Sequence, residues 1–308
     1  MPDNMNEMPW ALVAVAPNNR PLSQDALAAA AQAAGGRGKS FRDLGQTAQS
    51  HALELILAPD RRLAPPMFRD ALARAMPEGC DWALLPAEGR RKTLLVCDMD
   101  STVIGQECLD ELADFAGLKA EVAAITERAM RGELDFEGAL TTRVAMLKGL
   151  GLDALERCYA ERITLNPGAR TLVGTMRAHG ARTVLVSGGF TFFTQRVAAA
   201  AGFDTDRGNT LVDDGERLTG EVGQPILGRE AKLAALEAES AARGGPAAAV
   251  CIGDGANDLA MITAAGLGLA YRAKPVVAGE ADAAIRHTDL RTALFFQGFE
   301  AGEFTEAG

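Results

Sequence analysis

Short, continuous apolar runs, separated by stretches with helical periodicity, occupy the chain from residue 93 onward. An apolar run without polar alternation is typical of a strand that is buried on both faces, as in a parallel sheet. This pattern constrains the fold strongly, because such strands need a layer of helices on each side. It predicts an α/β domain with a parallel sheet, whose strands include residues 93–97, 182–186, 248–252 and 267–271.

The first 90 residues have a different pattern, and we expect them to form a small unit of their own. Four strand patterns and two helical patterns follow each other in the order β-α-β-β-α-β, which is that of a ferredoxin-like domain. Ser23 is positioned to cap the first helix, and proline starts the second. The polar, basic segment 89–92 is interpreted as a linker. The strand patterns lie at residues 10–16, 40–46, 52–57 and 81–86, and the helical patterns at 23–34 and 65–76.

Three further segments interrupt or end the α/β domain. A long helical insertion, at about residues 107–162, follows its first strand. The polar stretch 206–223 has turn signals at 207–209 and 213–215, and is interpreted as a hairpin. The tail after Phe299 is acidic and contains glycine, so we expect it to be frayed.

Composition excludes several classes of protein. The 308 residues include 31 Lys and Arg against 41 Asp and Glu, a net charge of −10, which argues against a nucleic-acid-binding protein. Five cysteines without paired spacing indicate neither a disulfide framework nor a metal site. No apolar segment approaches the roughly 18 residues of a membrane helix. We therefore expect a cytoplasmic protein in a reducing compartment, with no membrane partner.

Polar residues follow three of the four predicted strands of the parallel sheet. They are Asp-Met-Asp-Ser-Thr at 98–102, Ser-Gly-Gly at 187–189 and Gly-Asp-Gly-Ala-Asn-Asp at 253–258. Open α/β sheets bind ligands beyond the carboxyl ends of their strands. These three segments are therefore predicted to converge in one site.

Asp98 and Asp100 are the first candidates for chemistry. Two carboxylates at i and i+2 can share a reacting centre when the local backbone brings both side chains to the same side. One carboxylate could then act as a nucleophile and the other as a general acid and base. The alternative is a capping loop in which Ser101 or Thr102 starts a helix. That loop would leave two carboxylates crowded at a buried edge, which requires a cation.

The segment 253–258 supplies two more carboxylates, Asp254 and Asp258. Glycines on both sides of Asp254 permit a tight turn. Oxygen ligands of this kind suit Mg²⁺, which takes one or two carboxylates, water and substrate phosphate. The alternative is that these are ordinary turn and N-cap residues.

The Ser-Gly-Gly segment precedes a helical stretch and could bind an anion through its backbone N–H groups. The alternative is a strand-to-helix turn that binds nothing. Lys232 lies in the next helical stretch, where most lysines are solvated, so a role for it depends on the other motifs.

Arg143 lies within an apolar stripe of the helical insertion. On a helical wheel, Leu140 and Leu147 lie within about 40° of Phe136. Arg143 lies about 20° to the other side of Phe136. A cation in such a stripe needs a partner. A substrate carboxylate would serve, and so would an internal ion pair with Glu137, and the sequence leaves both open.

Together these motifs resemble the four ordered motifs of the haloacid dehalogenase superfamily. The resemblance covers about residues 93–299. It implies a Rossmann-like parallel sheet in residues 91–299, with a helical cap inserted at about 107–165 and a flap formed by the hairpin. The pattern of residues 1–90 resembles the amino-acid-binding, ACT-like modules of some members, although topology carries no function.

Within the superfamily, the chain is similar to the phosphatases that release serine from phosphoserine, the last step of serine biosynthesis. Asp100 agrees with phosphoester hydrolysis, because ion-pumping members have Thr there. Met99 replaces a common Phe.

The resemblance also implies a role for each site residue. Glu107 and Arg143 would hold the amino acid, although a helical wheel places Glu107 opposite Leu109 and Ala113 and gives it no independent support. The other implied roles are Asp98 as nucleophile, Asp100 as acid and base, Mg²⁺ held by Asp98, Asp254 and the Asp100 carbonyl, phosphoryl contacts from Lys232, Ser187, Gly188 and Asn257, and Asp258 orienting Lys232 or metal-bound water.

Two other functions stay open at this point. The chain could hydrolyse another small phosphomonoester, or it could be a non-catalytic amino-acid sensor. For the N-terminal unit, homodimerisation, serine sensing and stabilisation are all compatible with the sequence.

Overall fold

The computed structural model describes residues 9–58, 65–130 and 135–307. Within these residues, none of the helices combines the length and hydropathy that crossing a bilayer requires. The strands are β1 (Trp10–Pro17), β2 (Gly38–Gln46), β3 (Ser50–Leu57), β4 (Asp81–Pro86), β5 (Leu94–Cys97), β6 (Arg182–Phe190), β7 (Thr205–Asn209), β8 (Leu211–Asp213), β9 (Leu218–Val222), β10 (Ala249–Gly253), β11 (Leu267–Tyr271) and β12 (Ala283–Ile285).

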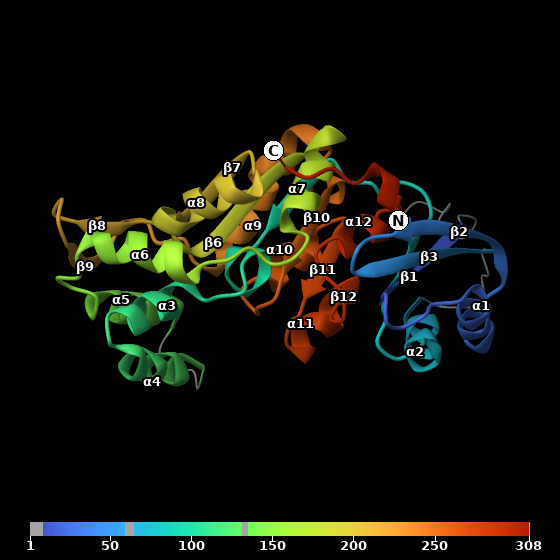
Figure 1. Ribbon diagram of the computed structural model, residues 1–308, viewed down its shortest axis with the longest axis horizontal. Helices are drawn as coiled ribbons and strands as arrows, with labels where there is room; N and C mark the ends of the chain where they lie inside the picture. The colour runs from blue at the N-terminus through green and yellow to red at the C-terminus, as the bar shows by residue number, and fades with distance from the viewer. Residues whose placement is uncertain (1–8, 59–64, 131–134, 308) are drawn as a thin grey trace.

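Helices cover both faces of the main sheet and form a separate lobe at one end of the molecule (Figure 1). They are α1 (Gln24–Ala33), α2 (Pro65–Ala75), α3 (Cys108–Phe115), α4 (Lys119–Met130), α5 (Phe136–Ala145), α6 (Leu152–Arg162), α7 (Ala169–Ala178), α8 (Thr191–Ala201), α9 (Arg229–Ser240), α10 (Leu259–Ala264), α11 (Pro275–Glu280) and α12 (Thr292–Phe296).

One sheet of ten strands runs through the molecule in the order β2-β3-β1-β4-β12-β11-β10-β5-β6-β7. The six strands from β12 to β7 are parallel, and they include the four predicted from apolar runs, which are β5, β6, β10 and β11. Successive side chains of β5 enter opposite apolar layers. Leu95 packs in the layer that contains residues of α7 and α12, and Leu94 in the layer of α9 and α10. The α/β fold is therefore confirmed.

The N-terminal residues have the predicted element order, and each predicted strand and helix is present within about two residues. Their strands pair antiparallel in the order β2-β3-β1-β4. Ser23 caps α1 by accepting a hydrogen bond from the N–H of Ala26 at 3.1 Å. Helices α1 and α2 cover one face of these strands, and the other face packs against α12.

The segment 89–92, interpreted as a linker, is packed at the junction between the two halves of the sheet. Arg90 is buried and forms an ion pair with Glu54 of β3. Arg91 stacks 4.0 Å over the ring of Phe299 and pairs with Glu303 at 2.8 Å. The basic residues of this segment therefore connect the N-terminal strands to the end of the chain.

The tail after Phe299 is not frayed over the residues that the structure describes, so that expectation was wrong. Thr305 accepts a hydrogen bond from Thr175 of α7 at 3.3 Å and donates one to it at 2.9 Å. The tail crosses α7 closely because Gly174 has no side chain, and a Cβ there would lie 2.5 Å from the carbonyl oxygen of Thr305. Phe304 also packs on Phe295, with ring centroids 4.9 Å apart.

The helical insertion after β5 consists of α3 to α6, and the short β8–β9 hairpin lies beside it (Figure 1). The hairpin is shorter than predicted, because residues 205–209 form β7 at the edge of the main sheet. An edge strand is polar because one side has no strand to cover it, which explains why the sequence resembled a turn there. The predicted turn at 213–215 is present, with Asp213 accepting from Gly215 at 2.9 Å.

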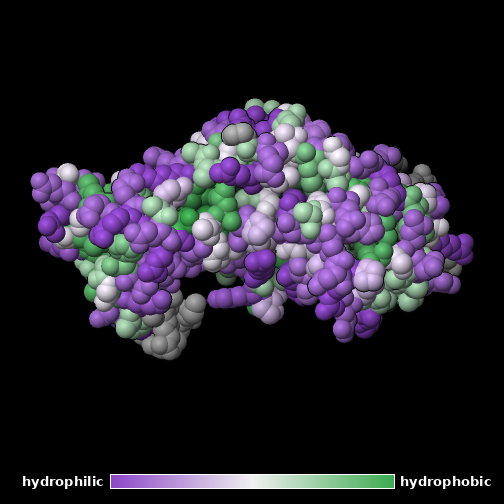
Figure 2. Space-filling model, in the orientation of Figure 1, coloured by the Kyte–Doolittle hydropathy of each residue, from purple (hydrophilic) through white to green (hydrophobic). Residues whose placement is uncertain are grey.

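The face in view is largely hydrophilic, with apolar surface gathered where the helical insertion meets the sheet domain (Figure 2). There α6 and α8 are joined by an ion pair between Arg196 and Glu156 at 2.5 Å. The hydroxyl of Tyr159 also donates to the carbonyl of Arg196 at 3.3 Å. The insertion is thus held against the sheet domain on the side of α8.

Candidate active site

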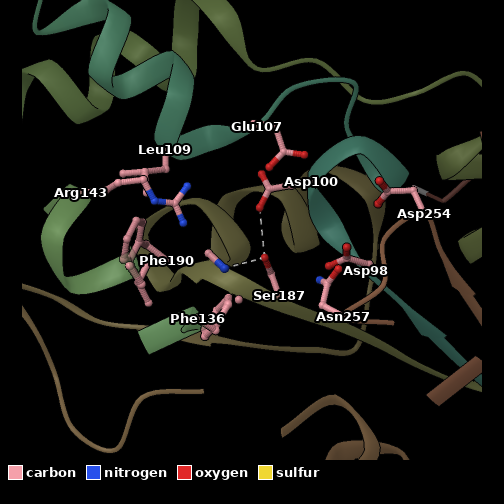
Figure 3. Close-up of a pocket in the computed structure, with 13 residues that line it drawn as sticks. Asp98, Asp100, Glu107, Leu109, Phe136, Arg143, Ser187, Phe190, Asp254 and Asn257 are labelled. Carbon is pink, nitrogen blue, oxygen red and sulfur yellow. Dashed lines mark hydrogen bonds between the residues drawn. The ribbon is translucent and has the colours of Figure 1, made fainter. Parts of the chain in front are cut away.

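The predicted polar segments meet at the carboxyl ends of β5, β6 and β10, around a pocket of about 150 Å³ (Figure 3). Helices α3 and α5 of the insertion close its other side. The pocket is lined by Asp98, Asp100, Glu107, Leu109, Phe136, Leu140, Arg143, Ser187, Gly188, Gly189, Phe190, Asp254 and Asn257. The site residues predicted from the sequence therefore converge, with Lys232 and Asp258 buried directly behind Asp98.

Asp98, directly after β5, forms a buried ion pair with Lys232, whose Nζ lies 2.6 Å from Oδ1. Burial raises the pKa of Asp98 well above its ordinary value, Asp258 raises it further, and Lys232 opposes both. Burial disfavours the charge of Lys232 as well, but the two carboxylates raise its pKa above the ordinary value. Lys232 is therefore a permanent cation at the base of the pocket.

Asp258 is fully buried and binds both Lys232 and the backbone that follows β10. Its Oδ1 accepts from Lys232 Nζ at 2.5 Å. Its Oδ2 accepts from the N–H groups of Asp254 and Gly255 at 3.2 and 3.0 Å. A Cβ on Gly253 would lie 2.5 Å from the Asp258 carboxyl carbon, so glycine is required there. Because both oxygens are used, Asp258 orients its neighbours rather than facing the pocket.

One carboxylate oxygen from each of Asp98, Asp254 and Asp258 lies within 4.8 Å of the other two. Burial, followed by the charge of Asp258, raises the pKa of Asp254 to about 6. One oxygen of Asp254 accepts from Thr102 at 3.2 Å. Three carboxylates beside the single cation of Lys232 leave excess negative charge, which suits a hard divalent cation. Asp98 and Asp254 have the oxygens to hold it.

Asp100 faces the same pocket because the backbone turns directly after it. Asp100 has extended dihedral angles, and the next residue, Ser101, has φ of 54°. Asp100 Oδ1 accepts from the N–H of Cys108 at 2.9 Å, and Oδ2 accepts from Ser187 Oγ at 3.2 Å. Burial raises its pKa. Asp98 and Asp100 therefore line one pocket, as the two-carboxylate hypothesis expected, and the capping-loop alternative is not what forms.

Glu107 is the residue before α3 rather than part of it, so the helical wheel that placed it opposite Leu109 did not apply. Its Oε1 accepts from Ser101 Oγ at 2.6 Å. Burial, followed by the charge of Asp100, raises the pKa of Glu107 to about 7. Glu107 and Asp100 lie side by side at the pocket (Figure 3).

Arg143 enters the pocket from α5, opposite Glu107 (Figure 3). Its Nε donates to the carbonyl of Ala139 at 3.3 Å, and no ion pair to it is found among the described residues. Glu137 is exposed, and the alternative of an Arg143–Glu137 ion pair is not what the structure contains. Burial lowers the pKa of Arg143, which remains a cation.

Phe136, which the sequence placed in the apolar stripe with Arg143, forms a wall of the pocket instead and is 37% exposed. Its ring lies against Gly188, where an added Cβ would be 3.1 Å from Cζ. Ser187 Oγ accepts from the N–H of Gly189 at 2.8 Å. Asn257 lines the pocket as predicted.

Sequence reasoning missed Ser101, Cys108 and Asn209 as supports of the site. Ser101 and Cys108 directly follow the predicted site residues Asp100 and Glu107, so their place in the sequence indicated that they lie near the site. Asn209 is 2% exposed and bonds to Gly188 from β7 at 2.8 Å, but it lay in a segment interpreted as a turn.

Comparison with known proteins identifies relatives for this arrangement. A family profile described as haloacid dehalogenase-like hydrolase matches residues 95–263. A phosphoserine phosphatase of Polaromonas sp. is 47% identical over 203 residues, which cover 64% of this chain and 86% of that protein. One of Streptomyces coelicolor is 43% identical over 244 residues, which cover 78% of this chain and only 59% of that protein.

Solved structures extend the likeness to the N-terminal strands. A haloacid dehalogenase family hydrolase from Salmonella enterica serovar Typhi superposes with a TM-score of 0.81 and 29% identity, covering 95% of this chain and 99% of that one. A substrate-bound phosphoserine phosphatase superposes with a TM-score of 0.62 and 36% identity, covering 67% of this chain and 98% of that one.

Proposed function

The chain belongs to the haloacid dehalogenase-like hydrolases, and on that premise we propose that it is a phosphoserine phosphatase. The reaction is hydrolysis of O-phospho-L-serine to serine and phosphate, the last step of serine biosynthesis. One observation carries the proposal: Glu107 and the guanidinium of Arg143 face each other in the same small pocket as Asp98 and Asp100. An ammonium and a carboxylate on one small phosphoester match these two groups.

Asp98 is the nucleophile in this proposal. It attacks phosphorus in line and forms an aspartyl-phosphate, while Asp100 donates a proton to the departing serine oxygen. The raised pKa of Asp100 favours the protonated form that this step needs. Asp100 then takes a proton from the water that hydrolyses the intermediate. Uncatalysed phosphomonoester hydrolysis is among the slowest reactions known, so several charged groups are needed together.

The phosphoryl oxygens are bound by Lys232, Ser187 and the N–H of Gly188, with Asn257 beside them. Asp258 keeps Lys232 in position through its bond to Nζ. Glu107 and Arg143 hold the amino acid portion.

Asp98, Asp254 and the carbonyl of Asp100 would hold Mg²⁺, which supplies electrostatic stabilisation of the phosphoryl oxygens when bound. The excess of carboxylates and the raised pKa of Asp254 support this assignment.

The remaining assignments concern the other parts of the chain. The insertion at 107–165 acts as a cap on the hydrolase core of residues 91–299, and residues 300–308 form its tail. Residues 1–90 form a ferredoxin-like, ACT-like module, and the strand order β2-β3-β1-β4 supports the ferredoxin-like topology. The role proposed for this module is homodimerisation. A cytoplasmic location is supported by five cysteines that are all unpaired and buried.

Phosphate release from a panel of small phosphoesters, with and without Mg²⁺, tests the proposal. Phosphoserine should be the best substrate and Mg²⁺ should be required. Preference for another ester, together with an Arg143→Ala variant whose kcat/KM for phosphoserine is unchanged, would favour a different phosphomonoesterase. Absence of any hydrolysis would favour an amino-acid sensor.

A further inference from the structure

Asn209, the last residue of β7, makes three side-chain hydrogen bonds while 2% exposed. Its Nδ2 donates to the carbonyl of Gly188 at 2.8 Å and to that of Leu227 at 3.2 Å. Its Oδ1 accepts from the N–H of Leu227 at 2.7 Å. A side-chain amide whose donor and acceptor are both used in a buried position fixes the two backbone segments that it joins.

The first of these segments is the Ser-Gly-Gly loop, where the ladder between β6 and β7 is interrupted. Val186 pairs with Arg207, and the next pair is Phe190 with Asn209, so the intervening residues of β6 leave the regular ladder. The carbonyl of Gly188 lies in this interruption and has Asn209 as its partner. Asn209 therefore replaces the ladder bonds that the loop has lost.

This bond continues toward Asp100. The peptide unit between Gly188 and Gly189 is planar, so fixing its carbonyl also fixes its N–H. That N–H donates to Ser187 Oγ at 2.8 Å, and Ser187 Oγ in turn donates to Asp100 at 3.2 Å (Figure 3). Asn209 thus stands at the outer end of a short hydrogen-bonded chain that reaches the proposed acid and base.

The second segment leads into α9, which carries Lys232. Leu227 precedes Gly228, which is the N-cap of α9. Gly188 and Gly228 both lie against the ring of Phe136, since added Cβ atoms would be 3.1 and 3.5 Å from it. By joining the two segments, Asn209 sets the surface on which Phe136 lies.

We propose that Asn209 is a positioning residue for the phosphoryl group: it fixes the Gly188–Gly189 peptide, and through it the hydroxyl of Ser187 that binds phosphate, without touching substrate. The inference rests on the proposed function, because it takes Ser187 and Gly188 as phosphoryl ligands. The serine portion of the substrate is held elsewhere, by Glu107 and Arg143. Loss of Asn209 should therefore weaken binding at one end of the pocket and not at the other.

The experiment measures phosphate binding and serine binding, at the two ends of the pocket, in the Mg²⁺-loaded enzyme. Asn209→Asp keeps the shape but turns a carboxylate oxygen toward the carbonyls of Gly188 and Leu227. We expect kcat for phosphoserine to fall by about 10- to 100-fold, as for other small displacements of reacting groups. The Kd of inorganic phosphate, measured by calorimetry, should rise about tenfold or more, while inhibition by serine stays within twofold of the original.

Val173→Ala serves as the stability control, because Val173 is buried on α7 and lines no part of the pocket. This variant should lower Tm and leave the phosphate Kd and the inhibition by serine unchanged. If Asn209→Asp does not fold, Asn209→Ser, which keeps a hydroxyl donor, is measured in the same way and should also bind phosphate more weakly. An unchanged phosphate Kd, or equal weakening for phosphate and serine, would overturn the proposal.

Calorimetry separates this inference from the proposed function. If the wild-type enzyme binds phosphate but does not hydrolyse phosphoserine, the proposed phosphatase function is contradicted and the test of Asn209 still applies. If the wild-type enzyme does not bind phosphate, the positioning role of Asn209 is itself contradicted.

Discussion

Ionisation of Glu107 should make the recognition of the substrate's amino group depend on pH. An unperturbed glutamate side chain ionises near pH 4.5, but burial and the neighbouring charge of Asp100 raise the pKa of Glu107 to about 7. Its ionised fraction in the free enzyme then rises from about one tenth at pH 6 to about nine tenths at pH 8. Only the ionised form attracts an ammonium group.

The assay compares two substrates at each pH. The first is phosphoserine, and the second is 3-phosphooxypropanoate, the same ester without the amino group. The ratio of their kcat/KM values cancels the titration of Asp100 and of the phosphate itself, and it should rise about tenfold from pH 6 to pH 8. Glu107→Gln should lower the ratio at pH 8 by about 10- to 100-fold, since a hydrogen bond to a charged group contributes about 1.5–3 kcal/mol.

The reasoning would be refuted by a ratio that does not change with pH in the original enzyme. It would also fail if Glu107→Gln kept the original slope, because the titrating group would then be another residue. Ser101→Ala gives a further check. Ser101 donates to Glu107 at 2.6 Å, a bond that lowers its pKa, so this variant should move the rise to higher pH.

Three other outcomes follow from the structure. Asp98→Asn should lower kcat by at least about 10³-fold with an unchanged circular dichroism spectrum, and hydrolysis at the original rate would exclude Asp98 as nucleophile. Burial raises the pKa of Asp254 to about 6, so the folded protein binds this proton more tightly than the unfolded chain and loses stability as pH rises through 6. Mg²⁺ at a hundredfold its Kd should therefore raise Tm by about 4 °C at pH 8 and by much less at pH 5, and equal shifts would contradict a site at these carboxylates. Phe304→Ala should lower the free energy of unfolding in urea by about 1–3 kcal/mol, whereas Met67→Ala, which removes a 74% exposed side chain, should not; equal stabilities would mean that the tail does not contribute.

The parallel sheet could be predicted from sequence because its strands are buried on both faces. A strand such as β5, with every residue buried, leaves an unmistakable apolar run. The carboxyl ends of such strands define a site before any side chain is placed, and for that reason Asp98, Asp100 and Asp254 could be brought together in advance.

Features that depend on neighbours distant in the chain could not be predicted in this way. The edge strand β7 has one uncovered side and therefore no apolar signature. The tail is ordered by α7, more than 120 residues earlier in the sequence, through contacts that need the bare backbone of Gly174. For Glu107, the helical wheel failed because the residue precedes the helix, and helix boundaries are uncertain by one or two residues in any assignment.

The seam between the N-terminal strands and the parallel sheet has a mechanical consequence. Strands β4 and β12 meet at a single backbone pair, Trp82 with Ala284, whereas β1 and β3 pair over eight residues. Beside this pair the seam is held by one carboxylate, because Asp81 of β4 accepts hydrogen bonds from the N–H groups of Arg286, His287 and Thr288, directly after β12. The apolar layer shared with α12 and the ion pair of Arg90 add to this attachment. A force that peels the first strands away would break one backbone pair and the hydrogen bonds of one buried carboxylate, rather than a long ladder. The N-terminal part should therefore detach as an intact body under load, before either half of the sheet begins to unravel.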